Sequence, residues 1–193
     1  MEFGVSQPRD EDGLLLKGEA LFSGDRAFDR EVWLYVVRSE HAAGQITSID
    51  LSEAKDMEGV HAILTGADAE AKSMNSFELR YRPLGTELTE HPVRPLAERV
   101  VRYVGEPVAV IVADTEAVAL DAAEAIQIDI DPSDAVTDAR KADTESSPSI
   151  WPEGNTVFTQ KLGNDAGYET ALKEAAHVVT ARIDTSSVAA VTL

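Results

Sequence analysis

The stretch RVVRYVGEPVAVIVAD, residues Arg99 to Asp114, decides the fold because it is the strongest local signal in the chain. Two apolar, β-branched runs are interrupted there by Gly105, Glu106 and Pro107. Proline cannot donate a hydrogen bond to a sheet, so Pro107 is expected to begin a strand. Glycine can take a backbone angle that other residues avoid. The stretch therefore predicts two strands separated by a sharp corner.

A helix and another strand are expected directly after this stretch. Asp114 or Thr115 can cap the helix, and Glu116 lies in its first turn, where the helix dipole favours an acid. Apolar positions recur every four residues from Val118 to Ile126, and then every second residue along IQIDIDP. The period thus changes from 3.6 to 2. The order of strand, helix and strand predicts a βαβ-like unit.

Short strands and helical turns are also expected before this stretch. The run EVWLYVVR is apolar at successive positions, as is typical of a strand covered on both faces. Ser52 is expected to cap a short helix that Gly59 ends. The segments predicted here are, in chain order, a strand at 31–38, a strand at 45–50, the helix that begins at Ser52, a strand from Val60 and a helical turn at 66–71.

The remaining stretches are less regular. Residues 72–98 hold three prolines and show no periodicity, which favours a surface loop. Residues 132–155 are rich in Asp, Ser, Thr and Pro and predict a linker. An edge strand (156–163), a helix capped by Asp165 and a final strand (177–184) are expected next. The chain ends in VAAVTL, an apolar run that is expected to continue into a larger protein, with the last strand frayed or covered by a second copy.

Composition excludes several classes of function. The chain has 193 residues, 44% of them hydrophobic, and a formal net charge of −18. Such a charge repels phosphate backbones and anionic lipids, which argues against nucleic-acid and membrane-surface binding. No apolar run approaches the roughly 18 residues of a spanning helix, and the first residues show no secretory signal. Cysteine is absent, so the chain has neither disulfides nor thiolate ligands. A cytoplasmic location is expected.

Candidate catalytic groups are few and scattered. The four histidines, His41, His61, His91 and His177, lie far apart, and each is interpreted as a surface or structural residue. Most carboxylates fall on polar faces of predicted elements. The stretch Gly163 to Gly167 is interpreted as a simple helix entry, since Asp165 would repel an anion. Glu106, at the corner between two apolar strands, is expected to bond backbone amides. The sequence therefore offers no catalytic, cofactor-binding or metal-binding residue to name.

Several segments nevertheless follow one another in an order that resembles a known family. They are KGEALFSGD (17–25), Arg38, Ser39, His41, Ala42, Gly44, Ile46, Ile49 and Asp50 of the next run, Glu58 to Asp68, Leu96 to Ala113, then Asp121, Glu124 and Asp129, and finally GNDAGYETALKEAAHVVTARI. Together they resemble the molybdenum hydroxylases, a family that includes xanthine dehydrogenase, aldehyde oxidase and aerobic carbon monoxide dehydrogenase. The resemblance extends over about residues 15–193, and Leu96 to Ala113 is similar to the family's most recognisable hairpin.

The resemblance implies the α/β hammerhead domain that opens the molybdopterin-binding large subunit. The implied fold is α/β (α+β), with a mixed sheet and short flanking helices. The parent enzyme would hydroxylate an aldehyde or an N-heterocycle carbon with oxygen from water, using a molybdopterin-type molybdenum cofactor, iron–sulfur clusters and FAD. The family residues that hold the molybdenum cofactor and act as base fall after this chain, so this segment alone is expected to be inactive and to hold no cofactor.

The expected organisation is a lead-in at 1–14, the hammerhead domain at 15–138, a linker at 139–156, and the start of the molybdopterin-binding domain at 157–193. The expected partners are the remaining large-subunit domains, the iron–sulfur and flavin subunits or domains, and a second copy through the C-terminal strand. Two alternatives stay open: a stand-alone acidic α/β interaction module, and a small hydrolase that uses Glu106 and a histidine. The spacing of residues gives the hydrolase no support.

Overall fold

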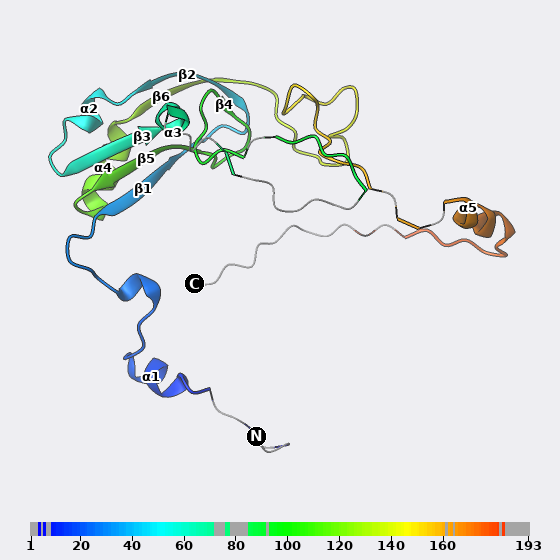
Figure 1. Cartoon of the computed structure of the whole chain (residues 1–193), viewed down its shortest axis with the longest axis horizontal. Coiled ribbons are helices and arrows are strands. Elements are labelled where there is room, and N and C mark those ends of the chain that lie inside the picture. The colour runs from blue at the N-terminus through cyan, green and yellow to red at the C-terminus, as the bar shows by residue number, and fades with distance from the viewer. Residues whose placement is uncertain are drawn as a thin grey trace.

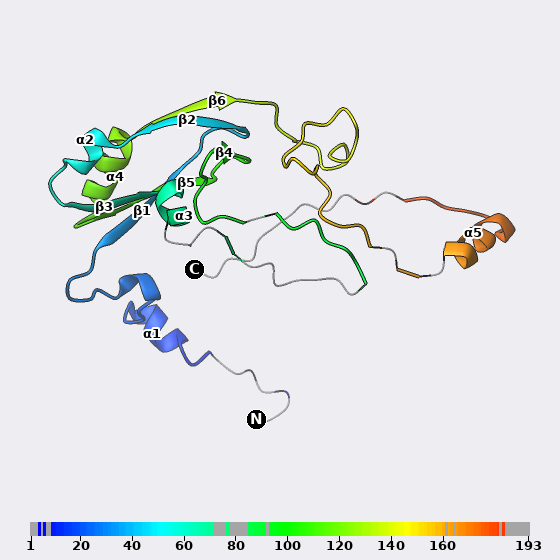
Figure 2. The ribbon, with the colours of Figure 1, turned by 45° about the horizontal axis from the view of Figure 1, so that its top comes forward.

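A computed structural model describes residues 4, 6, 9–71, 76, 77, 85–91, 93–160, 162, 163, 165–181 and 183. The described strands form two three-stranded sheets. The two sheets lie together at one end of the molecule, as Figures 1 and 2 both show. The helices α1 (Asp12–Lys17) and α5 (Asp165–Glu174) lie apart from the sheets. None of the described helices is long and apolar enough to cross a membrane.

The first sheet has the order β1-β5-β3, with β5 in the centre. Its strands are β1 (Trp33–Arg38), β5 (Pro107–Ala113) and β3 (Val60–Thr65). Both pairings are antiparallel, with Ile111 of β5 opposite Tyr35 and Ile63. The central position of β5 explains its continuous apolar sequence, because a strand with two neighbours and two packed faces has little contact with water.

The second sheet has the order β4-β2-β6, and it is antiparallel as well. Its strands are β4 (Val100–Val101), β2 (Gly44–Asp50) and β6 (Gln127–Pro132). The fold class is confirmed as a small α/β domain with short flanking helices. The expected mixed sheet is corrected in one respect, since every pairing between the described strands is antiparallel.

The expected βαβ-like unit is wrong in its pairing. The strand, helix and strand do follow one another as β5, α4 (Glu116–Ala125) and β6, but the two strands belong to different sheets. The same holds for the expected hairpin, because β4 and β5 also lie in different sheets. Alternation predicts a strand and its buried face, whereas the choice of partner depends on contacts far along the chain.

Other expected elements are confirmed with small shifts. Thr115 caps α4, because its hydroxyl accepts a hydrogen bond from the amide of Val118 at 3.2 Å. Pro107 begins β5, and Gly105 has a φ of 86°. The helix α3 (Gly66–Ala71) forms as expected. The helix α2 (Ser52–Lys55) differs in its cap, since the carboxylate of Asp50 rather than Ser52 accepts the first amide, at 2.9 Å. It also ends at Lys55, before Gly59.

The structure differs from the expectation for three of the strands. The first, now β1, is an edge strand whose Trp33 and Leu34 are exposed, so it is not covered on both faces. The described residues of 156–163 and of 177–184 form no strand. Both stretches have β-branched sequences but no neighbouring strand to pair with in the described structure. VAAVTL lies outside the described residues, as does most of 72–84.

The core lies against β5 on both of its faces. One cluster joins β5 and β3 to α2 and α4 through small and branched side chains. The other joins β5 to the second sheet through Val108, Val101 and Ala97. Ile49 and Ile128 contact both clusters, so the two sheets share one continuous core. The fully buried residues Ile111, Val101 and Val108 are its largest completely enclosed side chains.

Candidate functional site

Two corners of the chain meet where the two sheets come together. Ser39, just after β1, is buried, and its amide donates to the carbonyl of Glu106 at 2.9 Å. The amide of Gly105 donates back to the carbonyl of Ser39 at 2.8 Å. The guanidinium of Arg38 reaches the Gly105 carbonyl at 2.9 Å. Two stretches that the sequence separates by more than sixty residues thus form one junction, which fixes the corner before β5.

Glu106 is the buried carboxylate of this junction. Its side chain accepts a hydrogen bond from the backbone amide of Arg102 at 2.5 Å, and its other oxygen lies 4.0 Å from the Arg102 guanidinium. The interpretation of Glu106 as a turn carboxylate that bonds backbone amide is confirmed. Both contacts within the described structure go to Arg102 and neither goes to a histidine, so the geometry gives no support to a Glu106–histidine hydrolase.

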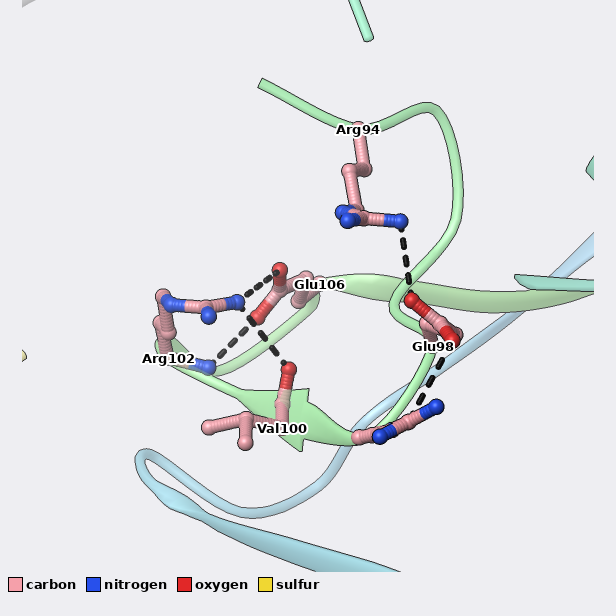
Figure 3. A network of polar contacts seen from close by, with 6 residues as sticks. Arg94, Glu98, Val100, Arg102 and Glu106 are labelled. Atoms are coloured by element: carbon pink, nitrogen blue, oxygen red, sulfur yellow. Dashed lines mark hydrogen bonds and ion pairs between the residues drawn. The ribbon is translucent and has the colours of Figure 1, made fainter. Parts of the chain in front are cut away.

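Three arginines and two glutamates gather beside this junction, and they are called the arginine cluster below. Glu98 bridges two of them, since one oxygen accepts from Arg94 at 2.8 Å and the other lies 3.3 Å from Arg99 Nε. Figure 3 shows Arg94 reaching toward Glu98 while Arg102 reaches toward Glu106. A cavity of about 380 Å³ is lined by the three arginines together with Glu98 and Val100.

Arg102 is the least exposed arginine of the cluster, with 23% of its side chain accessible. Burial lowers its pKa from the ordinary value, the negative charge of Glu106 raises it, and the positive charge of Arg94 lowers it further. The guanidinium still keeps its charge at neutral pH. Its Nε is buried and has no hydrogen-bond partner among the described residues.

An aromatic stack joins this cluster to the irregular stretch that follows β6. The guanidinium of Arg102 lies 3.9 Å from the ring centre of Trp151. His91 stacks on the same indole, with ring centres 4.5 Å apart and planes 1° from parallel. The His91 side chain is only 8% exposed, and Nδ1 lies 3.7 Å from Glu153. Arginine on an aromatic face and stacked rings each add about 1 kcal/mol to an interface.

The predicted linker is therefore not a free tether. Asn155 organises its last turns, accepting from the amide of Ile150 at 2.7 Å and donating to the carbonyls of Ala142 and Pro148 at 2.7 and 2.8 Å. The amide of Thr89 donates to the carbonyl of Val157 at 2.9 Å. The two irregular stretches, 85–91 and 142–157, therefore contact each other, and Trp151 joins them to Arg102, which directly follows β4.

The expectation for the histidines is confirmed for those with described contacts. His91 is a structural ring in the stack, and His61 is a surface residue whose Nε2 lies 2.6 Å from Asp114. His41 and His177 are exposed. The helix carboxylates expected on a solvated face are exposed as well, namely Glu116, Asp121 and Glu124 with Asp129 and Asp131 of β6. Gly163 to Gly167 leads into α5 as a helix entry; within it, Asn164 lies outside the described residues.

The sequence did not single out the arginine cluster or Trp151. A signal was present in both cases: three arginines fall within nine positions of a strongly acidic chain, and one tryptophan stands in an otherwise polar stretch. The arrangement offers guanidinium donors and apolar stacking surfaces. Among the described residues, no three histidines, aspartates or glutamates gather as a metal site would require.

Comparisons with known proteins agree with one another. Residues 17–134 match the family model described as "Aldehyde oxidase and xanthine dehydrogenase, a/b hammerhead domain". The nicotine 6-hydroxylase large subunit of Paenarthrobacter nicotinovorans is 34% identical over 187 residues, which are 97% of this chain and 22% of that protein.

Solved structures of enzymes are similar to this chain as well. Quinoline 2-oxidoreductase from Pseudomonas putida 86 superposes with a TM-score of 0.72 at 33% identity, covering 80% of this chain and 19% of that one. The Cu,Mo-CO dehydrogenase superposes with a TM-score of 0.76 at 26% identity, covering 90% and 23%. The chain spans about a fifth of the length of these relatives. The family model covers more than half of the chain, so this chain belongs to the aldehyde oxidase and xanthine dehydrogenase family by virtue of its α/β hammerhead domain.

Proposed function

We propose that this chain is the N-terminal structural segment of a molybdenum hydroxylase large subunit. The observation that carries the proposal is the match of residues 17–134 to the hammerhead family, together with coverage of only about a fifth of the relatives. In this proposal the parent enzyme hydroxylates an aldehyde or an N-heterocycle carbon. The segment itself supplies a rigid support rather than reacting groups.

The cofactors of the parent enzyme form part of the proposal. A molybdopterin-type molybdenum cofactor would supply the redox chemistry, with iron–sulfur clusters and FAD elsewhere in the enzyme. In this proposal the cofactor is bound by other parts of the subunit. What this chain's own residues do is hold two sheets around β5 and fix the loops beside β4.

The proposed partners are the remaining large-subunit domains and the iron–sulfur and flavin subunits or domains. Exposed apolar side chains support contacts of this kind, because large exposed apolar patches are typical of interaction surfaces. Leu34 of β1 is 62% exposed, and Val179 and Ile183 near the C-terminus are 92% and 85% exposed. A second copy of the chain could cover the same C-terminal residues. A cytoplasmic location, suggested by the cysteine-free composition, completes the proposal.

The proposed domain boundaries are a lead-in at 1–14, a hammerhead at 15–138, a linker at 139–156 and the start of the next domain at 157–193. Support comes from the two sheets, which end at Pro132 of β6, and from the position of α5 away from them (Figure 1). The contact of Trp151 with Arg102 supports anchoring of the 139–156 stretch to the hammerhead.

The coding sequence beyond Leu193 tests the proposal. A continuation of several hundred residues with glycine-rich pterin-binding loops is the expected result. A natural stop near Leu193 would contradict it and would favour the stand-alone acidic interaction module. Metal analysis of the purified 193-residue chain gives an independent check, and stoichiometric molybdenum in it would contradict the assignment of the cofactor to other domains.

A further inference from the structure

We infer that the cavity of the arginine cluster binds a small oxyanion, of the carboxylate or phosphate class, between Arg94 and Arg102. This inference goes beyond the proposed structural role of the domain and does not depend on it. Three observations carry it: the unmatched charge of the cluster, the missing hydrogen-bond partner of Arg102, and the shape of the cavity that the arginines share.

The charges of the cluster do not balance. Glu98 contacts Arg94 and Arg99 together, while Glu106 has one oxygen committed to a backbone amide and the other 4.0 Å from Arg102. Three guanidiniums against two carboxylates leave one positive charge. That surplus lies in a chain whose net charge is −18. A local positive site in an acidic protein attracts a small anion that the rest of the surface repels.

Arg102 has fewer hydrogen bonds than its donors can make. A guanidinium carries five N–H donors. The polar contacts of the Arg102 guanidinium in the described structure are a 3.3 Å bond from Nη1 to the carbonyl of Val100 and the 4.0 Å ion pair with Glu106, and its face lies on the Trp151 ring. The buried Nε has no partner in the described part of the chain. Buried donors without a protein partner are rare in folded proteins, and such a donor can mark the place where a water molecule or an ion binds.

The cavity brings a second guanidinium to the same space. Arg94 and Arg102 both line it. Burial is the main cause that lowers the pKa of Arg102, Glu106 raises it, and the charge of Arg94 lowers it further. Two like charges that share a partly buried cavity repel each other, and the carboxylates of Glu98 and Glu106 offset this repulsion only in part, because Glu98 also pairs with Arg99 and Glu106 lies 4.0 Å from Arg102. Oxygen pairs of a carboxylate or a phosphate match the fork of a guanidinium, and such bidentate contacts are among the stronger hydrogen bonds of proteins. An oxyanion would thus supply both the acceptors and the charge that the cluster lacks.

Titration of the 193-residue chain by NMR tests this inference. Inorganic phosphate and acetate are added in separate experiments, and chloride keeps the ionic strength constant. The expected result is a saturable shift of the backbone amides from Arg94 to Arg102, with a dissociation constant on the order of 1 mM, weak because the cavity is open. Saturation by phosphate alone would identify a tetrahedral dianion as the ligand, and saturation by acetate would identify a carboxylate.

Variants separate binding from general charge effects. Arg94→Gln removes one guanidinium from a partly exposed position and should weaken binding about tenfold. Arg102→Lys keeps the charge but not the fork, so it should weaken binding too while retaining the fold. Arg140→Gln is the matched control, because Arg140 is exposed and pairs with Asp138 away from the cavity. Shifts no larger than those caused by chloride, or equal binding by Arg94→Gln and the wild type, would overturn the inference.

Discussion

Glu106 illustrates how a single side chain can join several parts of this domain. Its carboxylate bonds the backbone of Arg102 and faces the Arg102 guanidinium, while its own carbonyl accepts from Ser39. Sequence reasoning identified this residue because a carboxylate between two apolar strands is unusual. Its main partner could not be predicted, since the turn that brings Arg102 back to it depends on the positive φ of Gly105 and on the Ser39 contact.

Glu106→Ala should lower the free energy of unfolding by about 2–3 kcal/mol, because the backbone amide of Arg102 loses its acceptor and the guanidinium loses its nearest carboxylate. Urea unfolding followed by circular dichroism measures the change. Glu124→Ala, on the exposed face of α4, is the control and should stay within about 0.5 kcal/mol of the wild type. Equal stability of the two variants would show that Glu106 is not a structural residue.

Asp50 gives a prediction about pH. Hydrogen bonds from the Ser52 hydroxyl at 2.6 Å and from the Ser52 amide at 2.9 Å lower the pKa of Asp50 below its ordinary value. Because the pKa of Asp50 is lower in the folded chain than in the unfolded chain, the ionised carboxylate stabilises the fold at pH values above the unfolded-state pKa of about 3.9. This stabilisation is lost as the pH falls through the lower pKa of the folded state. NMR titration should find Asp50 below the ordinary value in the wild type and closer to it in Ser52→Ala. An unchanged pKa in the variant would contradict this cause.

At the level of elements, sequence periodicity predicted which segments form strands but not how they pair. β5 was expected from its continuous apolar run, and α4 from its capping residue and spacing. The separation of β4 and β5 into two sheets was missed, because β4 has only two residues and its pairing with β2 is set by tertiary contacts. The strands expected at 156–163 and 177–184 were wrong for a related reason, since β-branched sequence forms a strand only beside a partner.

Gly66 lies where α3 contacts the segment before β4, and its substitution tests this contact. A Cβ at this position would lie 2.6 Å from the Cα of Glu98 and closer still to the carbonyl oxygen of Ala97. Both are backbone atoms, so relief requires the chain to move. Gly66→Ala should therefore destabilise the domain by about 2 kcal/mol. Gly24→Ala has open space and is the matched control. Thermal unfolding compares the two, and equal midpoints would mean that the close approach is absent.

Substitution of Trp151 tests whether the 139–156 stretch is anchored to the hammerhead. Removing the indole in Trp151→Ala deletes its contacts with both His91 and Arg102. The free energy needed to open the stretch should then fall by about 1.4 kcal/mol. The amide of Ile150 should therefore exchange its hydrogen about tenfold faster. Trp33→Ala, at the exposed edge of β1, is the control and should leave this amide unchanged. Identical exchange in both variants would indicate a free linker.

At the scale of the whole molecule, sequence resemblance predicted the family and the fold class correctly. The resemblance did not point to the arginine cluster. The three arginines are close in sequence, but their arrangement depends on contacts with Ser39 and Trp151, which lie far from them in the chain. The described structure is a two-sheet unit with a shared core around β5, followed by residues with little burial. Val178, Val179 and Ile183 are 57%, 92% and 85% exposed. These apolar residues find no packing partner within the described structure.

We conclude that the two sheets around β5, together with the 139–156 stretch that contacts them, form the stable unit of this chain, whereas the exposed apolar residues 178, 179 and 183 add nothing to its stability. Amide hydrogen exchange of the monomeric chain tests this claim most directly. The amides of Val108 to Ile111 should exchange only by global unfolding, and those of His177 to Ala181 should exchange nearly as fast as in an unfolded peptide. Protection of His177 to Ala181 equal to that of β5 would contradict it.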